Sequence, residues 1–354
     1  MFPVPLAIAA GPALGLLVID LEPSPGSVVS GVEPQRVARP DGSTGLRVLL
    51  YRTDGLVDVY REPGAPVDST LGDGLGQVAD VAFTRAVLEL GPDALDVDVE
   101  FCRPGGARTR VRVHQAPVRG RPFTFLAPVG VGVARPDKLF CVVMRRFGML
   151  RRSGAVCEVE VDGVVRQVSS FPPLLDGRQM AMVRFSPDSV VGDLNPDGFL
   201  AAAVATDGVT ETGGTRYLVR DGVVRRLSAG DGDRAVHLEL EPGLPDVSAL
   251  AGGETHEARW RFVVAGVDVA SGRLRATGRD GATALELAVT RGWRPRGVPL
   301  GMWLVTWVLP GFRRWPTTYR WDGLLRDGEV TGAWSRTVGP PYTLARRRTG
   351  REQH

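Results

Sequence analysis

The sequence predicts an all-β protein, and three observations support that class. Twelve aspartates are followed directly by glycine, and Asp-Gly between apolar runs is typical of tight hairpin turns, whose two central residues need a positive φ. Apolar and polar residues alternate with a period of two in one stretch after another. Convincing helical patterns are nearly absent. The Asp-Gly pairs begin at Asp41, Asp54, Asp73, Asp162, Asp176, Asp197, Asp207, Asp221, Asp231, Asp280, Asp322 and Asp327.

The alternating stretches are the expected strands. In chain order they are 45–52, 95–101, 109–114, 155–161, 236–241 and 256–264. In a strand, alternate side chains point to opposite faces, so one face of each is expected to be buried. Short helices are expected only at 246–252 and at 78–90, where a strand fits equally well. The run 302–309 is expected to be a strand that is apolar on both faces.

Two β-domains follow from the length and from an internal resemblance. Segments of the first half recur in the same order in the second, namely 104–114, 122–126, 144–148 and 161–165 against 279–288, 299–303, 312–316 and 321–325. We interpret this as a duplicated β-domain whose halves meet near 172–187, with chance similarity between Gly-rich β-segments as the alternative. The expected division is an apolar arm at 1–20, β-domains at 21–180 and 181–345, and a basic tail at 346–354.

The first nineteen residues carry no charged side chain. They lack the basic start of a signal peptide, and prolines and glycines interrupt any spanning helix. An arm that packs against the body is therefore expected, with secretion or anchoring as the alternative.

Composition bounds the function. The chain has 354 residues, 43% hydrophobic and 23% charged, which is ordinary for a soluble globular protein. A net charge of +3, scattered arginines and one lysine, Lys138, argue against nucleic-acid binding, and no stable membrane insertion is expected. Three cysteines without C-x-x-C spacing indicate a reduced, cytoplasmic protein. Neither zinc-ligand spacing nor a nucleotide or hydrolase motif is present, so no metal and no cofactor are expected.

Many short antiparallel strands must close into a barrel or pack as a sandwich, or they expose sheet edges. Each domain has roughly the length of an up-and-down barrel of about eight strands, whose interior holds one small apolar ligand. Two tandem lipocalin-like barrels or half-barrels are the expected architecture. The oligomeric state is left open.

This pattern resembles a known group. Two tandem lipocalin-like barrels with an aromatic second half that ends in Tyr319-Arg-Trp-Asp-Gly323 resemble the carotenoid 1,2-hydratase and AttH-like proteins. Lipocalin-type natural-product cyclases, including Diels-Alderases, share that architecture. The resemblance spans Leu46 to Thr343, rests on the domain pattern, and transfers no catalytic residue. It implies a long, apolar, often polyene-bearing substrate held in or between the barrels, with acid catalysis or control by shape.

Three residues are candidates for acid–base catalysis. His256 is the one histidine expected to point into an apolar interior, where it could act near neutral pH. Asp322 follows Trp321 and could be a buried, protonated acid, although a hairpin turn explains it equally simply. Tyr319 shares a face with Trp321 and could donate a hydrogen bond to a substrate carbonyl. For His256 a core or strand-end role is the alternative.

The densest aromatic tract, Trp293 to Trp334, holds six of the seven tryptophans. An aromatic ligand pocket is one interpretation and a filled core is the other. The expected substrate-binding residues are Trp260, Trp293, Met302, Trp303, Trp307 and Trp321.

Three functions remain open. The first is a cofactor-independent enzyme that binds a polyene, polyketide or terpenoid substrate and catalyses its cyclisation, isomerisation or hydration, largely by holding one reactive conformer. The second is a non-catalytic lipid or pigment binding protein. The third is a partner-binding β-protein whose aromatic face lies at an interface.

Overall fold

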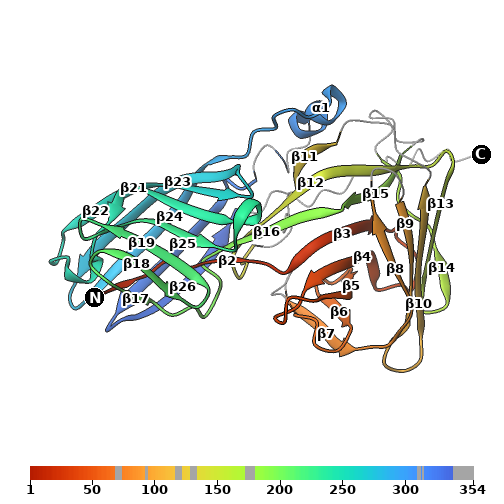
Figure 1. Ribbon diagram of the computed structural model, residues 1–354, viewed down its shortest axis with the longest axis horizontal. Helices are drawn as coiled ribbons and strands as arrows, with labels where there is room; N and C mark the ends of the chain where they lie inside the picture. Colours follow the sequence, from red (N-terminus) through yellow and green to blue (C-terminus); the bar gives the residue numbers. More distant parts are fainter. Residues whose placement is uncertain are drawn as a thin grey trace, which may run out of the picture.

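The computed structural model describes residues 1–67, 74–91, 95–115, 122–127, 134–171, 180–308, 312 and 315–337. The predicted all-β class is confirmed: within these ranges the chain forms strands β1 to β26 and a single α-helix, α1 (Leu300–Val308). Figure 1 shows two lobes side by side, with α1 above the place where they meet.

The second lobe contains one nine-stranded sheet, in which neighbours in sequence are also neighbours in space. Such a meander is what tight turns between successive strands produce. Its strands are β18 (Gly208–Thr212), β19 (Thr215–Arg220), β20 (Val223–Ala229), β21 (Val236–Leu244), β22 (Thr255–Val264), β23 (Val267–Arg279), β24 (Ala282–Gly292), β25 (Tyr319–Arg326) and β26 (Glu329–Arg336).

The first lobe contains two packed sheets. The ten-stranded sheet has the order β2 (Ile8–Ala10), β16 (Asp188–Leu194), β12 (Leu139–Arg151), β15 (Met180–Ser186), β3 (Ala13–Asp20), β4 (Val29–Ala38), β5 (Thr44–Arg52), β6 (Val57–Arg61) and β7 (Leu75–Asp80), with β11 (Phe123–Ala127) beside β12. The five-stranded sheet has the order β14 (Val164–Arg166), β13 (Ala155–Val161), β10 (Arg108–Gln115), β9 (Leu95–Cys102) and β8 (Phe83–Leu90). Among the described strands, only the β6–β7 pairing is parallel.

The six alternating stretches all form strands, as β5, β9, β10, β13, β21 and β22. In β9 buried apolar side chains alternate with half-buried carboxylates. The alternation of apolar and polar residues in the sequence therefore identifies the buried face of this strand correctly. The ambiguous run 78–90 is two strands, β7 and β8. The helix expected at 246–252 is a single 3₁₀ turn, Val247–Ala249, in which Asp246 Oδ1 accepts a hydrogen bond from Ser248 N.

The Asp-Gly pairs in the described part of the chain adopt the backbone of turns, with one exception. In every pair that lies wholly within the described residues, except Asp322-Gly323, the glycine has a positive φ. At Asp162, Asp221 and Asp327 the aspartate also has a positive φ, as a type I′ turn requires. Asp322-Gly323 lies inside β25 instead, so the turn interpretation is wrong there. Residues 161–165 form a hairpin, whereas residues 321–325 lie in the interior of a strand. The structural equivalence expected for these two segments is therefore wrong.

Residues 1–20 form strands that join both lobes. β1 (Phe2–Val4) pairs with β17 (Ala202–Val204), β2 pairs with β16, and β3 continues into the first lobe. Figure 1 shows this red segment crossing from one lobe to the other. The side chains of Phe2, Val4, Leu6 and Ile8 are buried in the core of the second lobe. We call residues 1–10 the N-terminal arm.

The two lobes also pack directly on each other. Gly192 on β16 lies so close to Val264 and Phe262 of the second lobe that a Cβ at this position would meet both side chains. Arg234 of the second lobe donates hydrogen bonds to Asp188 and to the backbone oxygens of Ala13 and Ser189. The lobes are thus held by the arm, by close packing and by ion pairs.

A carboxylic acid is buried inside the first lobe. Glu33 on β4 is 3% exposed, and its two carboxylate oxygens accept hydrogen bonds from Tyr51 Oη and Gln35 Nε2, both at 2.5 Å. Arg47 Nε donates to Gln35 Oε1 at 2.6 Å. Burial removes the carboxylate from water and raises the pKa of Glu33, while the hydrogen bonds oppose that shift only in part.

The raised pKa of Glu33 predicts a stability change with pH. Between the ordinary pKa of glutamate and the raised folded value, the folded protein holds a proton that the unfolded chain has lost. Stability should therefore fall as pH rises through that window. We expect Glu33→Gln to flatten this part of the curve, measured by urea unfolding across a pH series. The exposed Glu158→Gln variant is the control, and an unchanged slope in Glu33→Gln would contradict the assignment.

Candidate functional site

Three predicted site residues are part of the filled core of the second lobe. Trp260, Tyr319 and Trp321 are each at most 3% exposed. Trp260 Nε1 donates to the backbone oxygen of Arg273 at 3.1 Å. Trp321 lies over Gly323 and Gly332, where any Cβ would collide with its ring. Glycine is needed at these two strand positions because any side chain there would collide with the indole ring of Trp321. Trp321 therefore contributes to the packing of the core.

Tyr319 lies in an aromatic cluster. Its ring packs edge-on against Trp315 and Trp334, with centroids 6.3 and 6.1 Å away, and the Arg336 guanidinium stands 4.8 Å over it. Burial raises the pKa of the Tyr319 hydroxyl, so it stays protonated at neutral pH. The expectation that Tyr319 and Trp321 share a face is confirmed by their common burial.

Asp322 is not a buried acid. Its side chain is 56% exposed on the outer face of β25, where Arg320 Nε lies 3.0 Å from Oδ1. The period-two alternation of β25 explains the difference, because Trp321 points inward and its neighbour must point outward. The Asp322 carboxylate is therefore exposed to solvent and lies beside a guanidinium.

His256 does lie on the inward face of β22, with Ala258 and Trp260. It is half-buried, and its Nε2 is covered without a hydrogen-bond partner among the described residues. β23 and β24 separate β22 from β25, so His256 is three strands, roughly 14 Å along the sheet, from Tyr319 and Asp322. The three candidate catalytic residues are therefore not brought together.

The run expected as a doubly apolar strand is the helix α1, so that prediction is wrong for the described residues 300–308. Because nearly every position is apolar, the run satisfies a helical period as well as period two. Pro299 precedes the helix, and its backbone oxygen accepts a hydrogen bond from Trp303 N at 2.9 Å. Met302 is half-buried, whereas Trp303 and Trp307 are 44% and 60% exposed. Leu309 lies outside the described residues.

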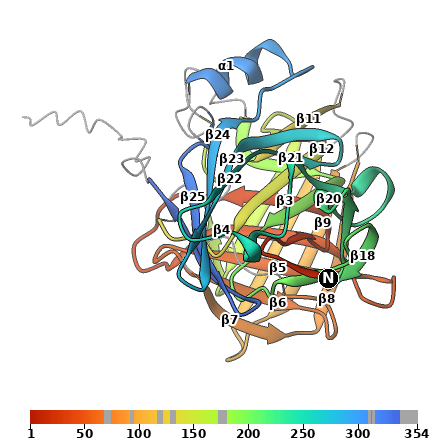
Figure 2. The same ribbon diagram turned by 90° about the vertical axis from the view of Figure 1, so that its left-hand side faces the viewer.

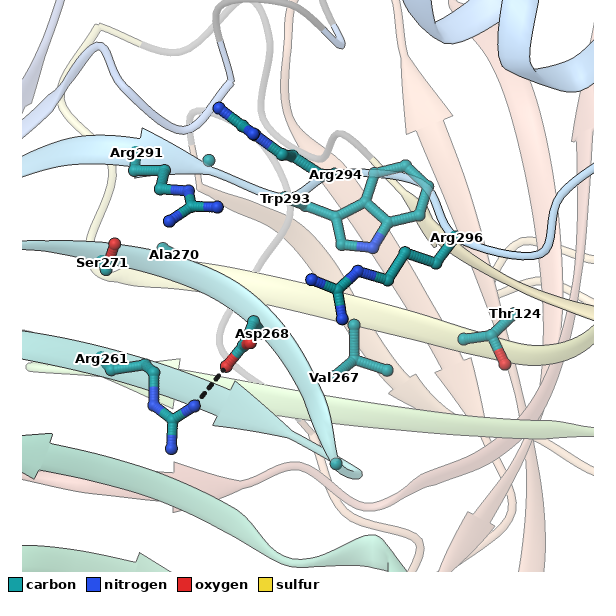
Figure 3. A pocket seen from close by; sticks show the side chains of 12 residues that line it. Thr124, Arg261, Val267, Asp268, Ala270, Ser271, Arg291, Trp293, Arg294 and Arg296 are labelled. Carbon is teal, nitrogen blue, oxygen red and sulfur yellow. Dashed lines mark hydrogen bonds and ion pairs between the residues drawn. The ribbon is translucent and has the colours of Figure 1, made fainter.

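Trp293, the remaining candidate, lines a pocket at the junction of the lobes. The pocket encloses about 240 Å³ and is formed by β22, β23, the segment that leads from β24 to α1, and Thr124 on β11 of the first lobe. Figure 3 shows Trp293 at its centre with arginine side chains around it. The arginines are Arg261, Arg291, Arg294 and Arg296. We call this site the arginine pocket.

Local sequence explains how the arginine pocket forms. β24 ends at Gly292, where the chain passes so close to Pro316 that a side chain would not fit. Pro295 then prevents the segment from continuing as a paired strand. On its apolar side, Trp293 packs edge-on against Phe125, with centroids 5.4 Å apart, and joins the cluster beneath α1 that contains Met302 and Val305.

The arginine pocket carries uncompensated positive charge. Arg261 is already paired, with Glu239 at 2.6 Å and with Asp268, the only carboxylate of the lining, at 3.2 Å. Arg291, Arg294 and Arg296 make no ion pair or hydrogen bond with any described residue. A guanidinium fork matches the oxygens of a carboxylate or phosphate. The arrangement is chemically suited to bind an anion beside an aromatic ring.

These arginines were not among the sequence-derived candidates. Arg261 lies on the outward face of β22, and that face borders the pocket. The available signal was the segment Arg291-Gly-Trp-Arg-Pro-Arg296, which concentrates three arginines around one tryptophan. It is a weak signal in a chain whose arginines occur throughout.

Within the described ranges, no group of three or more His, Cys, Asp or Glu side chains is placed to hold a metal ion. No helix in the described part of the chain has the length and apolarity that a membrane crossing would need. No family model, curated protein or solved structure matches the chain, and the arginine pocket is therefore interpreted from its own geometry.

Proposed function

We propose that the protein binds an anionic amphiphile, with the acidic head group in the arginine pocket. The observation that carries the proposal is the charge of that pocket: four arginines face one carboxylate, and three of the four lack an ion-pair partner among the described residues. A carboxylate or phosphate would supply the missing charge through charge-assisted hydrogen bonds.

The apolar part of the ligand has a surface on the same tryptophan. Trp293 lines the arginine pocket together with Val267 and Ala270, and it also packs against the apolar cluster that contains Phe125 and Met302. A volume of about 240 Å³ is at the small end for a ligand site, so the pocket accommodates a head group and the first part of a chain. This supports an amphiphile rather than a wholly apolar molecule.

Binding is favoured over catalysis by the groups that line the pocket. Its one carboxylate, Asp268, is paired with Arg261, and no histidine or tyrosine lies among the lining residues. A general acid–base mechanism needs a positioned group that can gain or lose a proton. The cyclisation, isomerisation or hydration expected from the family resemblance stays a prediction from the sequence.

The proposal predicts that oleate binds and that oleyl alcohol, which has the same chain without the charge, binds much more weakly. Isothermal titration calorimetry of both probes measures the difference. Removing two guanidinium groups with Arg294→Gln and Arg296→Gln should weaken oleate binding by roughly ten- to a hundredfold, since each charge-assisted hydrogen bond contributes about 1.5–3 kcal/mol before solvent screening.

The matched control is Arg220→Gln with Arg225→Gln, which removes the same charge from an exposed part of the same lobe. Its oleate affinity should equal that of the wild type. Equal affinities for oleate and oleyl alcohol, or equal losses in both double variants, would exclude the arginine pocket as a head-group site.

A further inference from the structure

The outer face of α1 is a contiguous apolar surface. Leu300, Trp303, Leu304, Trp307 and Val308 follow the spacing i, i+3, i+4, i+7, i+8 that places side chains on one side of a helix. All five are exposed, with Leu300 at 75%. The opposite side is already used, because Val305 and Thr306 are buried against the first lobe. Soluble proteins rarely expose such a patch without a partner.

The surroundings of this face are strongly basic. From Leu287 to Trp321 the sequence contains no aspartate or glutamate, and it contains six arginines. Among the described ones, Arg291, Arg294 and Arg296 are exposed on the segment that leads directly into α1. An occupant of this face should therefore combine an apolar interior with a negatively charged surface.

We infer that α1 docks this protein onto an anionic lipid bilayer. Tryptophan and leucine side chains on a short helix insert at the boundary between head groups and acyl chains, while neighbouring arginines bind anionic head groups. Figures 1 and 2 both show α1 at the upper edge of the molecule, where it can meet a flat surface. The docking is peripheral: its apolar contacts lie on α1, and the arginines beside α1 also line the arginine pocket.

Flotation with phosphatidylcholine vesicles that contain phosphatidylglycerol, compared with vesicles of phosphatidylcholine alone, tests this inference. The wild type should float with the anionic vesicles, and its tryptophan emission should shift to the blue. Trp303→Ser with Trp307→Ser should weaken vesicle binding by about tenfold or more, because two inserting side chains are lost. These side chains are exposed, so the variant should remain folded.

The control variant, Val165→Ser with Leu200→Ser, removes two apolar side chains that are exposed elsewhere and should bind vesicles like the wild type. Oleate affinity measured without vesicles should stay unchanged in the tryptophan variant, which separates this inference from the proposed ligand site. Equal binding to neutral and anionic vesicles, or no flotation, overturns it. So does a dimer in light scattering that the tryptophan variant dissociates, since a second copy would then cover α1.

Discussion

Truncation of Leu6 to alanine should destabilise the second lobe by about 2–5 kcal/mol, the usual cost of such a cavity in a closed core. Leu6 is fully buried, and the arm around it is held by polar contacts as well: its backbone oxygen accepts a hydrogen bond from Tyr217 Oη at 3.1 Å, and that of Ile8 accepts one from Thr215 Oγ1 at 2.7 Å.

Deletion of residues 2–8 should have a larger effect. The four buried side chains of the arm contribute about 1.5–3 kcal/mol each, a sum comparable with the whole stability of a domain. All seven tryptophans lie between Trp260 and Trp334, so their emission reports the second lobe and the segment around α1. We expect an unfolded, red-shifted spectrum for the deletion and an intermediate urea midpoint for Leu6→Ala.

The matched control for Leu6→Ala is Leu200→Ala, an exposed leucine near the same lobe, which should unfold like the wild type. A native emission spectrum in the deletion variant would show that the second lobe does not need the arm. The uncharged start of the chain would then be an accessory rather than part of the core.

Period two and turn chemistry were sufficient to predict most of the fold. Both are local: alternation over six or seven residues fixes a strand face, and a positive φ at Asp-Gly fixes a hairpin. The meander of the second lobe follows almost directly from them. The strands that pair with the N-terminal arm could not be predicted in this way. β1 pairs with β17, which lies about two hundred positions away, and no local pattern encodes such a pairing.

The errors have equally specific causes. Residues 300–308 are apolar at nearly every position, so period alone does not separate a strand from a helix, and the flanking prolines in fact favour a helix that starts after Pro299. Asp322-Gly323 resembles a turn, but its glycine is required by the Trp321 ring that lies across two strands. A glycine that makes room for the Trp321 ring was mistaken for a glycine that a turn requires.

The candidate site was predicted only in part. Trp293 and a site in or between the barrels were expected, and Trp293 lines a pocket at the junction of the lobes. The arginines around it come from β22, β24 and the segment before α1, and their convergence depends on how the nine-stranded sheet meets the first lobe. The tryptophan tract left both a ligand pocket and a filled core open, and four of the seven tryptophans are buried in the core.

The second large effect concerns the only lysine. Lys138 Nζ lies 2.6 Å from Asp193 Oδ2, with the two side chains only 1% and 8% exposed. Breaking a buried ion pair deprives the remaining charge of that partner, so Lys138→Met and Asp193→Leu should each cost about 3–5 kcal/mol. Urea unfolding followed by circular dichroism measures both losses.

The double variant distinguishes the ion pair from simple packing. If the cost comes from separating the two charges, Lys138→Met combined with Asp193→Leu should be much more stable than the sum of the single losses implies, because neither charge of the pair is left. Arg275 and Glu257 provide the comparison: their nitrogen–oxygen distance is also 2.6 Å, but both side chains are more than half exposed, so Arg275→Met should cost little.

The position of the pair explains why its loss should affect both lobes. In the ten-stranded sheet Asp193 is in register with Phe140 of β12 on one side and with Ala9 of the N-terminal arm on the other. An unpaired charge there favours water entry between the arm and β16, where the second lobe packs against the first. Strictly additive losses in the double variant would instead mean that Lys138 and Asp193 stabilise the junction independently.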